Sequence, residues 1–148
     1  MKLKDFDFRV WSVKKEKYLD ELYSNIISLS SDKSIKGYNR NYKILAIEFS
    51  PYDSIPLMND NEECFEIELF TGLCDKNGNK IYENDIVKVK SLYDDFLAKI
   101  RIHKAGTFYL ERKHGDYIGS LIYLVEDQGY IIEIIGNIHE NKELLEGE

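Results

Sequence analysis

The stretch that decides the fold runs from Phe70 to Val89 and reads FTGLCDKNGNKIYENDIVKV. At its centre, Asn77 and Gly78 both tolerate a positive φ, which suits a type I′ turn between two strands. Before the turn, residues 65–69 alternate apolar and acidic side chains, the pattern of a half-buried strand. Residues 86–90 alternate again after it. The stretch therefore predicts a β-hairpin that leads into a further strand.

The polar residues of this turn also raise the question of a calcium loop. Asp75, Asn77 and Asn79 occupy the first, third and fifth positions of such a loop. The sixth position requires glycine but is Lys80, and the twelfth requires glutamate but is Ile86. Short polar side chains that bond back to their own backbone explain the same residues as turn chemistry. We therefore predict no metal site here.

Three separated blocks of sequence carry a family resemblance. They are residues 8–11 (Phe-Arg-Val-Trp), the stretch 71–87, and residues 135–145, which begin Ile-Gly-Asn-Ile-His-Glu-Asn. In this order they resemble the YopX-like family of phage and prophage proteins. The chain departs from the pattern at Ser12, where Asp is frequent, at Asn84, where Gly is usual, and at His139, where Tyr is common. Asn84 is still able to adopt a left-handed turn conformation.

The resemblance implies a small β-rich protein that self-associates, in a family without a characterised activity. It therefore supplies a fold and a biological context, and it names no reaction.

Composition and charge narrow the classes of function. The 148 residues carry a net charge of −7: residues 1–60 hold 10 basic and 9 acidic side chains, and residues 61–148 hold 10 and 18. The acidic C-terminal part argues against binding of nucleic acid irrespective of sequence, because phosphate contacts dominate such affinity. Neither a membrane span nor a secretory signal is visible, so we expect a cytoplasmic protein in the host cell with no membrane partner.

The spacing of apolar residues predicts a mainly β fold with minor α content. Short strands at intervals of about ten residues predict a small SH3-like β-barrel or sandwich over 61–148. Residues 1–60 are predicted to form an N-terminal region with a β-hairpin, a short helix over 19–29, a strand over 42–49 and a self-association surface. The prolines of the segment after residue 50 indicate a linker. Residues 96–103, 108–112, 119–125 and 130–135 are expected to be strands, and 141–145 a short helical turn.

A basic strand is the most suggestive surface. Lys99, Arg101 and His103 point the same way on a strand, about 7 Å apart, and Arg112 extends the set. Basic groups among aromatic residues on a small barrel can hold single-stranded nucleic acid. The solvated face of an ordinary antiparallel strand explains the same pattern and is the preferred interpretation.

Tyrosines are abundant, with 11 in the chain. Tyrosine is favoured at interfaces because it combines a large apolar area with a polar tip. We predict self-association through a group of N-terminal tyrosines: Tyr18, Tyr23, Tyr38 and Tyr42.

No catalytic set can be nominated. The three histidines lack metal-binding spacing, Cys64 and Cys74 cannot form a zinc site alone, and no phosphate-binding glycine loop occurs. We therefore expect no cofactor, no metal and no catalytic residue. The leading hypothesis is a non-enzymatic phage or prophage accessory protein that acts through self-assembly and contacts with host or phage proteins. The alternatives are a nucleic-acid-binding barrel and a cryptic hydrolase.

Overall fold

The computed structural model describes residues 2–18, 26–30, 44–50, 53–57 and 65–146. The chain divides into two units, of which the first consists of Met1–Arg9 with Glu68–Glu148 and the second of Val10–Ile67. The second unit is therefore an insertion between Arg9 and Glu68 of the first. The predicted division into domains at residues 60 and 61 stays a prediction.

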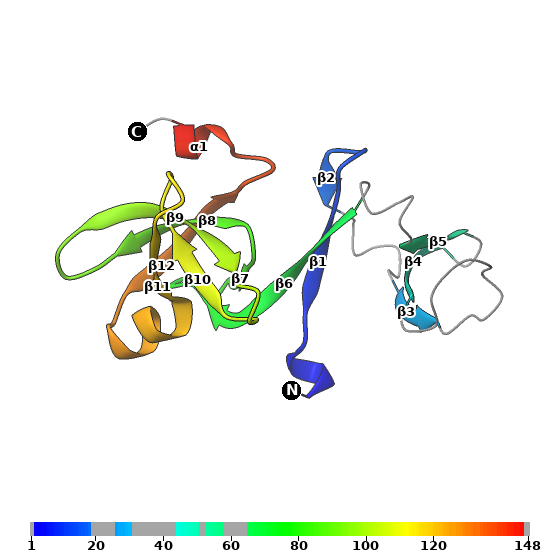
Figure 1. Ribbon diagram of the computed structural model, residues 1–148, viewed down its shortest axis with the longest axis horizontal. Coiled ribbons are helices and arrows are strands. Elements are labelled where there is room, and N and C mark those ends of the chain that lie inside the picture. Colours follow the sequence, from blue (N-terminus) through cyan, green and yellow to red (C-terminus); the bar gives the residue numbers. More distant parts are fainter. Residues whose placement is uncertain (1, 19–25, 31–43, 51–52, 58–64, 147–148) are drawn as a thin grey trace. The chain divides into compact units, whose positions relative to one another are not determined.

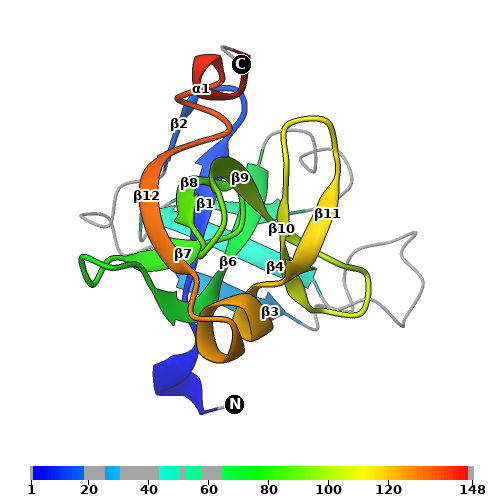
Figure 2. The same ribbon diagram turned by 90° about the vertical axis from the view of Figure 1, so that its left-hand side faces the viewer.

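Five antiparallel strands form the main sheet of the first unit, in the order β11-β10-β9-β8-β12 (Figures 1 and 2). The strands are β8 (Asp85–Lys90), β9 (Asp95–Ile102), β10 (Phe108–Glu111), β11 (Tyr117–Ser120) and β12 (Ile131–Asn137). Alternation decides which face is buried: Val87 and Val89 are buried, whereas Lys88 and Lys90 are exposed. Buried apolar side chains from β8, β9, β10 and β12 form the core with those of β7 and of the segment after β11.

A second sheet has the order β2-β1-β6-β7. Its strands are β1 (Phe8–Ser12), β2 (Lys17–Tyr18), β6 (Phe65–Cys74) and β7 (Lys80–Tyr82), and a short 3₁₀ turn at Leu3–Asp5 precedes β1. Trp11 pairs with Tyr18 in the β1–β2 register, which confirms the N-terminal hairpin. The mainly β fold, with a small barrel or sandwich after this hairpin, is confirmed as well.

The third sheet, in the second unit, corrects two predictions. Its order is β3-β4-β5, with β3 at Ile26–Ser30, β4 at Ile44–Ser50 and β5 at Asp53–Leu57. The predicted helix over 19–29 is wrong for residues 26–29, which pair with β4; residues 19–25 lie outside the described residues. The predicted linker contains β5, and Pro56 occurs there because an edge strand tolerates a residue without an N–H.

The Asn77-Gly78 hairpin is confirmed, but its turn differs from the predicted type. Only Gly78 of the pair has a positive φ, at 83°. The Gly78 N–H donates to the Asp75 carbonyl (3.0 Å) and the Asp75 N–H to the Asn79 carbonyl (2.8 Å), as in a three-residue hairpin loop closed by a glycine bulge. The same pair of bonds closes the turns 103–107 and 112–116.

Asp75 explains why this turn is built from short polar residues. Its Oδ1 accepts from the N–H groups of Asn77 and Asn79, both at 2.9 Å, and its Oδ2 accepts from Ile134 N–H on β12 at 3.1 Å. Lys76 N–H also donates to the Ile132 carbonyl at 2.9 Å. The turn therefore covers the outer edge of β12, which would otherwise present unpaired backbone groups.

The segment after β11 is helical, so the strand predicted over 119–125 is wrong beyond Ser120. Residues 121–122 are α-helical and Tyr123–Asp127 form a π-helical turn. Leu121 and Leu124, three residues apart, are both buried in the core, and a short apolar run does not distinguish this arrangement from a strand. The chain ends in helix α1 (Glu143–Glu146), close to the predicted turn. Among the described residues, no helix has the length and apolar character needed to cross a membrane.

Replacement of Asp75 tests the role of this turn. We expect Asp75→Ala to lower the free energy of unfolding by about 2–4 kcal/mol, because three backbone N–H groups lose a charged acceptor. Asn77→Ala, in the same turn but with an exposed side chain, is the matched control and should change it by less than about 0.5 kcal/mol. Urea unfolding of both variants provides the measurement, and equal effects would contradict the assignment.

Candidate functional site: a buried polar cluster around Glu68

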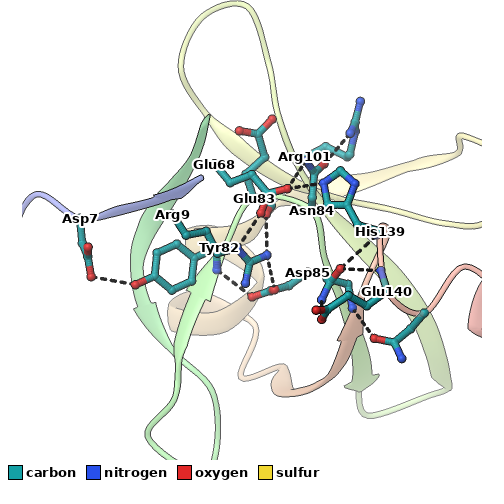
Figure 3. Close-up of polar contacts among 12 residues, drawn as sticks. Asp7, Arg9, Glu68, Tyr82, Glu83, Asn84, Asp85, Arg101, His139 and Glu140 are labelled. Atoms are coloured by element: carbon teal, nitrogen blue, oxygen red, sulfur yellow. Dashed lines mark hydrogen bonds and ion pairs between the residues drawn. The ribbon is translucent and has the colours of Figure 1, made fainter. Parts of the chain in front are cut away.

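A carboxylate without solvent exposure lies at the centre of the first unit. The side chain of Glu68 on β6 is 0% exposed and is surrounded by polar groups from distant parts of the chain (Figure 3). Burial of a carboxylate is unfavourable unless charges and hydrogen bonds compensate it. We call the group that does so the Glu68 cluster and define it by its members: Arg9, Glu68, Asn84, Asp85, Arg101 and His139.

Arg9 on β1 joins two buried carboxylates. Its Nε donates to Glu68 Oε2 at 2.6 Å, and its Nη2 lies 2.7 Å from Asp85 Oδ1. The same Nη2 donates to the Glu83 carbonyl at 3.2 Å, and the guanidinium lies 4.9 Å from the centre of the Tyr82 ring. One guanidinium therefore balances two acidic groups that have almost no access to water.

Asn84 connects the cluster to the main sheet. Its φ of 68° is left-handed, which confirms the conformation expected from the sequence. Its side-chain Nδ2 donates to Glu68 Oε1 at 2.8 Å, and its Oδ1 accepts from Arg101 Nη1 at 2.7 Å. Its backbone N–H donates to the Ile100 carbonyl and its carbonyl accepts from Ile138 N–H. Every polar group of this residue is therefore bonded.

His139 completes the coordination of Glu68, because its Nε2 lies 2.7 Å from Glu68 Oε1. The backbone turn that holds His139 depends on Asn137, whose Oδ1 accepts from the N–H groups of His139 and Glu140, both at 3.0 Å. A Cβ at Gly136 would lie 2.5 Å from Asn141 Oδ1, so the close approach of Asn141 requires glycine there. Gly136, Asn137 and Asn141 therefore shape the turn that holds His139 in place.

The pKa values of two acidic groups in and beside the cluster, Asp85 and Asp7, shift in opposite directions. Burial raises the pKa of Asp85, although Arg9 and the Tyr82 N–H oppose it; the nearby Glu68 carboxylate raises it further. Burial alone would also raise the pKa of Asp7, but hydrogen bonds from Lys80, Tyr82 and the Phe8 N–H lower it below its ordinary value. Lys80 Nζ lies 2.6 Å from Asp7 Oδ2, and the Tyr82 hydroxyl donates to the same oxygen at 2.7 Å.

The chemistry of this arrangement fits a structural role. A histidine beside a carboxylate is the pairing used in acid–base catalysis. Here, however, Glu68 Oε1 is shared between His139 and Asn84 while Oε2 binds Arg9. These contacts join β1 and β6 to the segments 82–85 and 137–139 and stabilise a fixed arrangement of the four.

The three blocks that carry the family resemblance meet in this cluster: residues 8–11 supply Arg9, residues 71–87 supply Asn84 and Asp85, and residues 135–145 supply His139. The family model described as YopX protein matches residues 7–146 of the chain. The chain belongs to the YopX family. None of the curated proteins compared with it matches.

Two solved structures share the fold of this YopX-family chain. Protein EF1440 from Enterococcus faecalis is 28% identical, with a TM-score of 0.54 and coverage of 95% of this chain and 97% of that one. Protein yopX from Bacillus subtilis is 17% identical, with a TM-score of 0.57 and coverage of 93% and 95%. These similarities establish a shared architecture over nearly the whole length.

The predicted basic surface consists of side chains that already have partners. Lys99 Nζ and Arg101 Nε lie 3.3 and 3.5 Å from Glu111 Oε2, and Arg101 also binds Asn84. Arg112 pairs with Asp94 at 3.2 Å and lies over the Phe96 ring, while His103 Nδ1 accepts from Ala105 N–H. A phosphate would have to compete with these contacts. Nucleic-acid binding through Lys99, Arg101, His103 and Arg112 stays a prediction.

The predicted tyrosine surface is described only at Tyr18. Its ring meets the Trp11 ring edge-on, with centroids 5.0 Å apart, within the N-terminal hairpin. Tyr23, Tyr38 and Tyr42 lie outside the described residues, so self-association through this group stays a prediction. No spacing in the sequence points to the Glu68 cluster. Arg9, Asn84 and His139 were visible only as parts of the family blocks, and Glu68 had the alternation of a solvent-facing residue.

Removal of Arg9 tests the cluster. We expect Arg9→Met to lower the free energy of unfolding by about 3–5 kcal/mol, because two buried carboxylates lose their shared cation. Adding Glu68→Gln should recover part of this loss, since the double variant removes one of those charges. Urea unfolding gives the values. Additive effects would contradict a direct interaction, and Arg9→Lys provides a milder variant should Arg9→Met not fold.

The same variant carries a pH signature through Asp85. A carboxyl whose pKa is higher in the folded state holds its proton more tightly there, so the folded state loses stability as the pH rises through that pKa. Loss of Arg9 removes a positive charge and a hydrogen bond that both lower the pKa of Asp85. The stability difference between wild type and Arg9→Met should therefore shrink as the pH falls through the raised pKa of Asp85. A constant difference would exclude Asp85 from the effect.

Proposed function

We propose that this protein is a non-enzymatic phage or prophage accessory protein that acts through self-association and contacts with other proteins. The observation that carries the proposal is the turn between β8 and β9. Leu92 and Tyr93 are 87% and 94% exposed at its tip. Two large apolar side chains in water gain free energy when a partner covers them, and tyrosine is a frequent hot-spot residue of interfaces.

This turn presents its side chains in a fixed geometry. Ser91 Oγ accepts from the N–H groups of Tyr93 and Asp94, at 3.2 and 3.0 Å, and donates to the Asp94 carbonyl at 2.8 Å. The Ser91 N–H donates to the same carbonyl at 3.1 Å. A turn ordered before contact loses less conformational entropy on binding, which favours association. The Glu68 cluster supports the same interpretation, because the contacts among its polar groups stabilise a scaffold.

Sedimentation velocity tests self-association. At tens of micromolar, the wild type is expected to sediment as an oligomer, and Leu92→Ser combined with Tyr93→Ser to shift it to a smaller species. Ile131→Ser, which removes another exposed apolar side chain at 48% exposure, is the matched control and should leave the oligomer unchanged. All variants should keep the unfolding midpoint of the wild type, since the substituted side chains are exposed.

Two results would contradict the proposal. A strictly monomeric wild type would exclude self-association, and an oligomer that survives both serine substitutions would exclude the turn as its contact. In the second case, the tyrosines at positions 18, 23, 38 and 42 are the next candidates, and Tyr23→Ser with Tyr38→Ser would test them.

A further inference from the structure

The first unit has a surface groove, and no residue of the β8–β9 turn lines it. Its walls are the end of β6 (residues 71–73), the β9–β10 turn with the start of β10 (residues 106–108) and the helical segment (residues 121, 122 and 126). It encloses about 430 Å³, within the range of binding sites for small molecules and peptide side chains. We call it the β6–β10 groove.

The walls of the groove are mainly apolar. Leu73, Phe108, Leu121 and Ile122 line it, and Ile122 is 55% exposed at its margin. Exposure of a large apolar side chain beside an apolar hollow marks a surface that a partner can cover.

One charged side chain, Glu126, lines the groove as well. It follows Ile122 by four residues on the helical segment, so the two side chains lie on one face. Glu126 is exposed and has no ion pair within the part of the chain that the structure describes. Residues 61–148 also carry eight more acidic than basic side chains. Both features favour a cationic ligand and disfavour phosphates and other anions.

The wall formed by the end of β6 suggests the shape of the ligand. The β6–β7 register pairs Phe70 with Tyr82 and Cys74 with Lys80, so residues 71–73 bulge out of the ladder. A Cβ at Gly72 would meet no atom within 4 Å, so the space beside this residue is open to a ligand. An open strand end beside an apolar hollow with one charged group is a surface on which an extended peptide can place successive side chains.

From these features we infer that the β6–β10 groove binds an extended segment of a partner protein that carries a Lys or Arg next to apolar side chains. The cation pairs with Glu126, and the apolar side chains cover Leu73, Phe108 and Ile122. The inference deepens the proposed function, because it names the chemistry of one protein partner. It uses a different surface from the Leu92–Tyr93 turn.

Selection of peptides from a random library displayed on filamentous phage tests the inference with the full chain as bait. Enriched peptides should share a Lys or Arg beside apolar residues. A synthetic peptide of the enriched sequence should bind Glu126→Lys and Ile122→Asp at least about tenfold more weakly than the wild type in a fluorescence titration. The matched controls are Asp127→Lys, the adjacent exposed carboxylate, and Ile131→Asp, since neither residue lines the groove. Both should bind like the wild type.

Several outcomes would overturn the inference. They are a selection without enrichment, a consensus without a basic residue, and equal weakening by Glu126→Lys and Asp127→Lys. A consensus that matches a segment of this chain would make the occupant a second copy in place of another protein. The variant with serine at positions 92 and 93 should still bind the peptide, so failure of the groove and failure of the proposed self-association are separate results.

Discussion

A carboxylate that has no contact with water has to find its hydrogen bonds within the protein, and Glu68 finds them in three segments of the chain. They include Arg9, 59 residues before it, Asn84, 16 residues after it, and His139, 71 residues after it. Because loss of one partner leaves a buried charge incompletely compensated, the segments that supply these residues are constrained together. Arg9 in turn neutralises Asp85, and Asn84 binds Arg101, so the constraint extends into β8 and β9.

The strands of the first unit were largely predictable because each has one apolar face. Residues 87–90 and 98–101 alternate as expected, and their apolar members Val87, Val89, Ala98 and Ile100 are fully buried. The same alternation wrongly predicts that Glu68 is exposed to solvent. Alternation places an acidic residue on the solvent side, but on that side Glu68 is covered by a half-buried polar partner, Arg9. A period of two reports which residues share a face, and it does not report what covers each face.

Other errors arose where local signals fit more than one structure. The run 121–125 is apolar throughout, so its helical packing through Leu121 and Leu124 is set by the core that it meets. The turn at Asn77-Gly78 has the composition of a two-residue loop, but the carboxylate of Asp75 favours the longer one by accepting from Asn77 and Asn79. His139 carries no spacing signal, because its partner lies on a different strand far away in sequence.

The ion pair between Arg9 and Glu68 has a consequence for the chain that lies between them. The first unit ends at Arg9 and resumes at Glu68, so this pair joins the two ends of the insertion. While residues 10–67 are unfolded, closing that loop costs about 3–4 kcal/mol of chain entropy. Once the insertion is folded, its two ends are already held close together, so most of this entropic cost of loop closure disappears. The folding equilibria of the two units are therefore coupled through loop entropy, and any event that orders the insertion also stabilises the unit that encloses it.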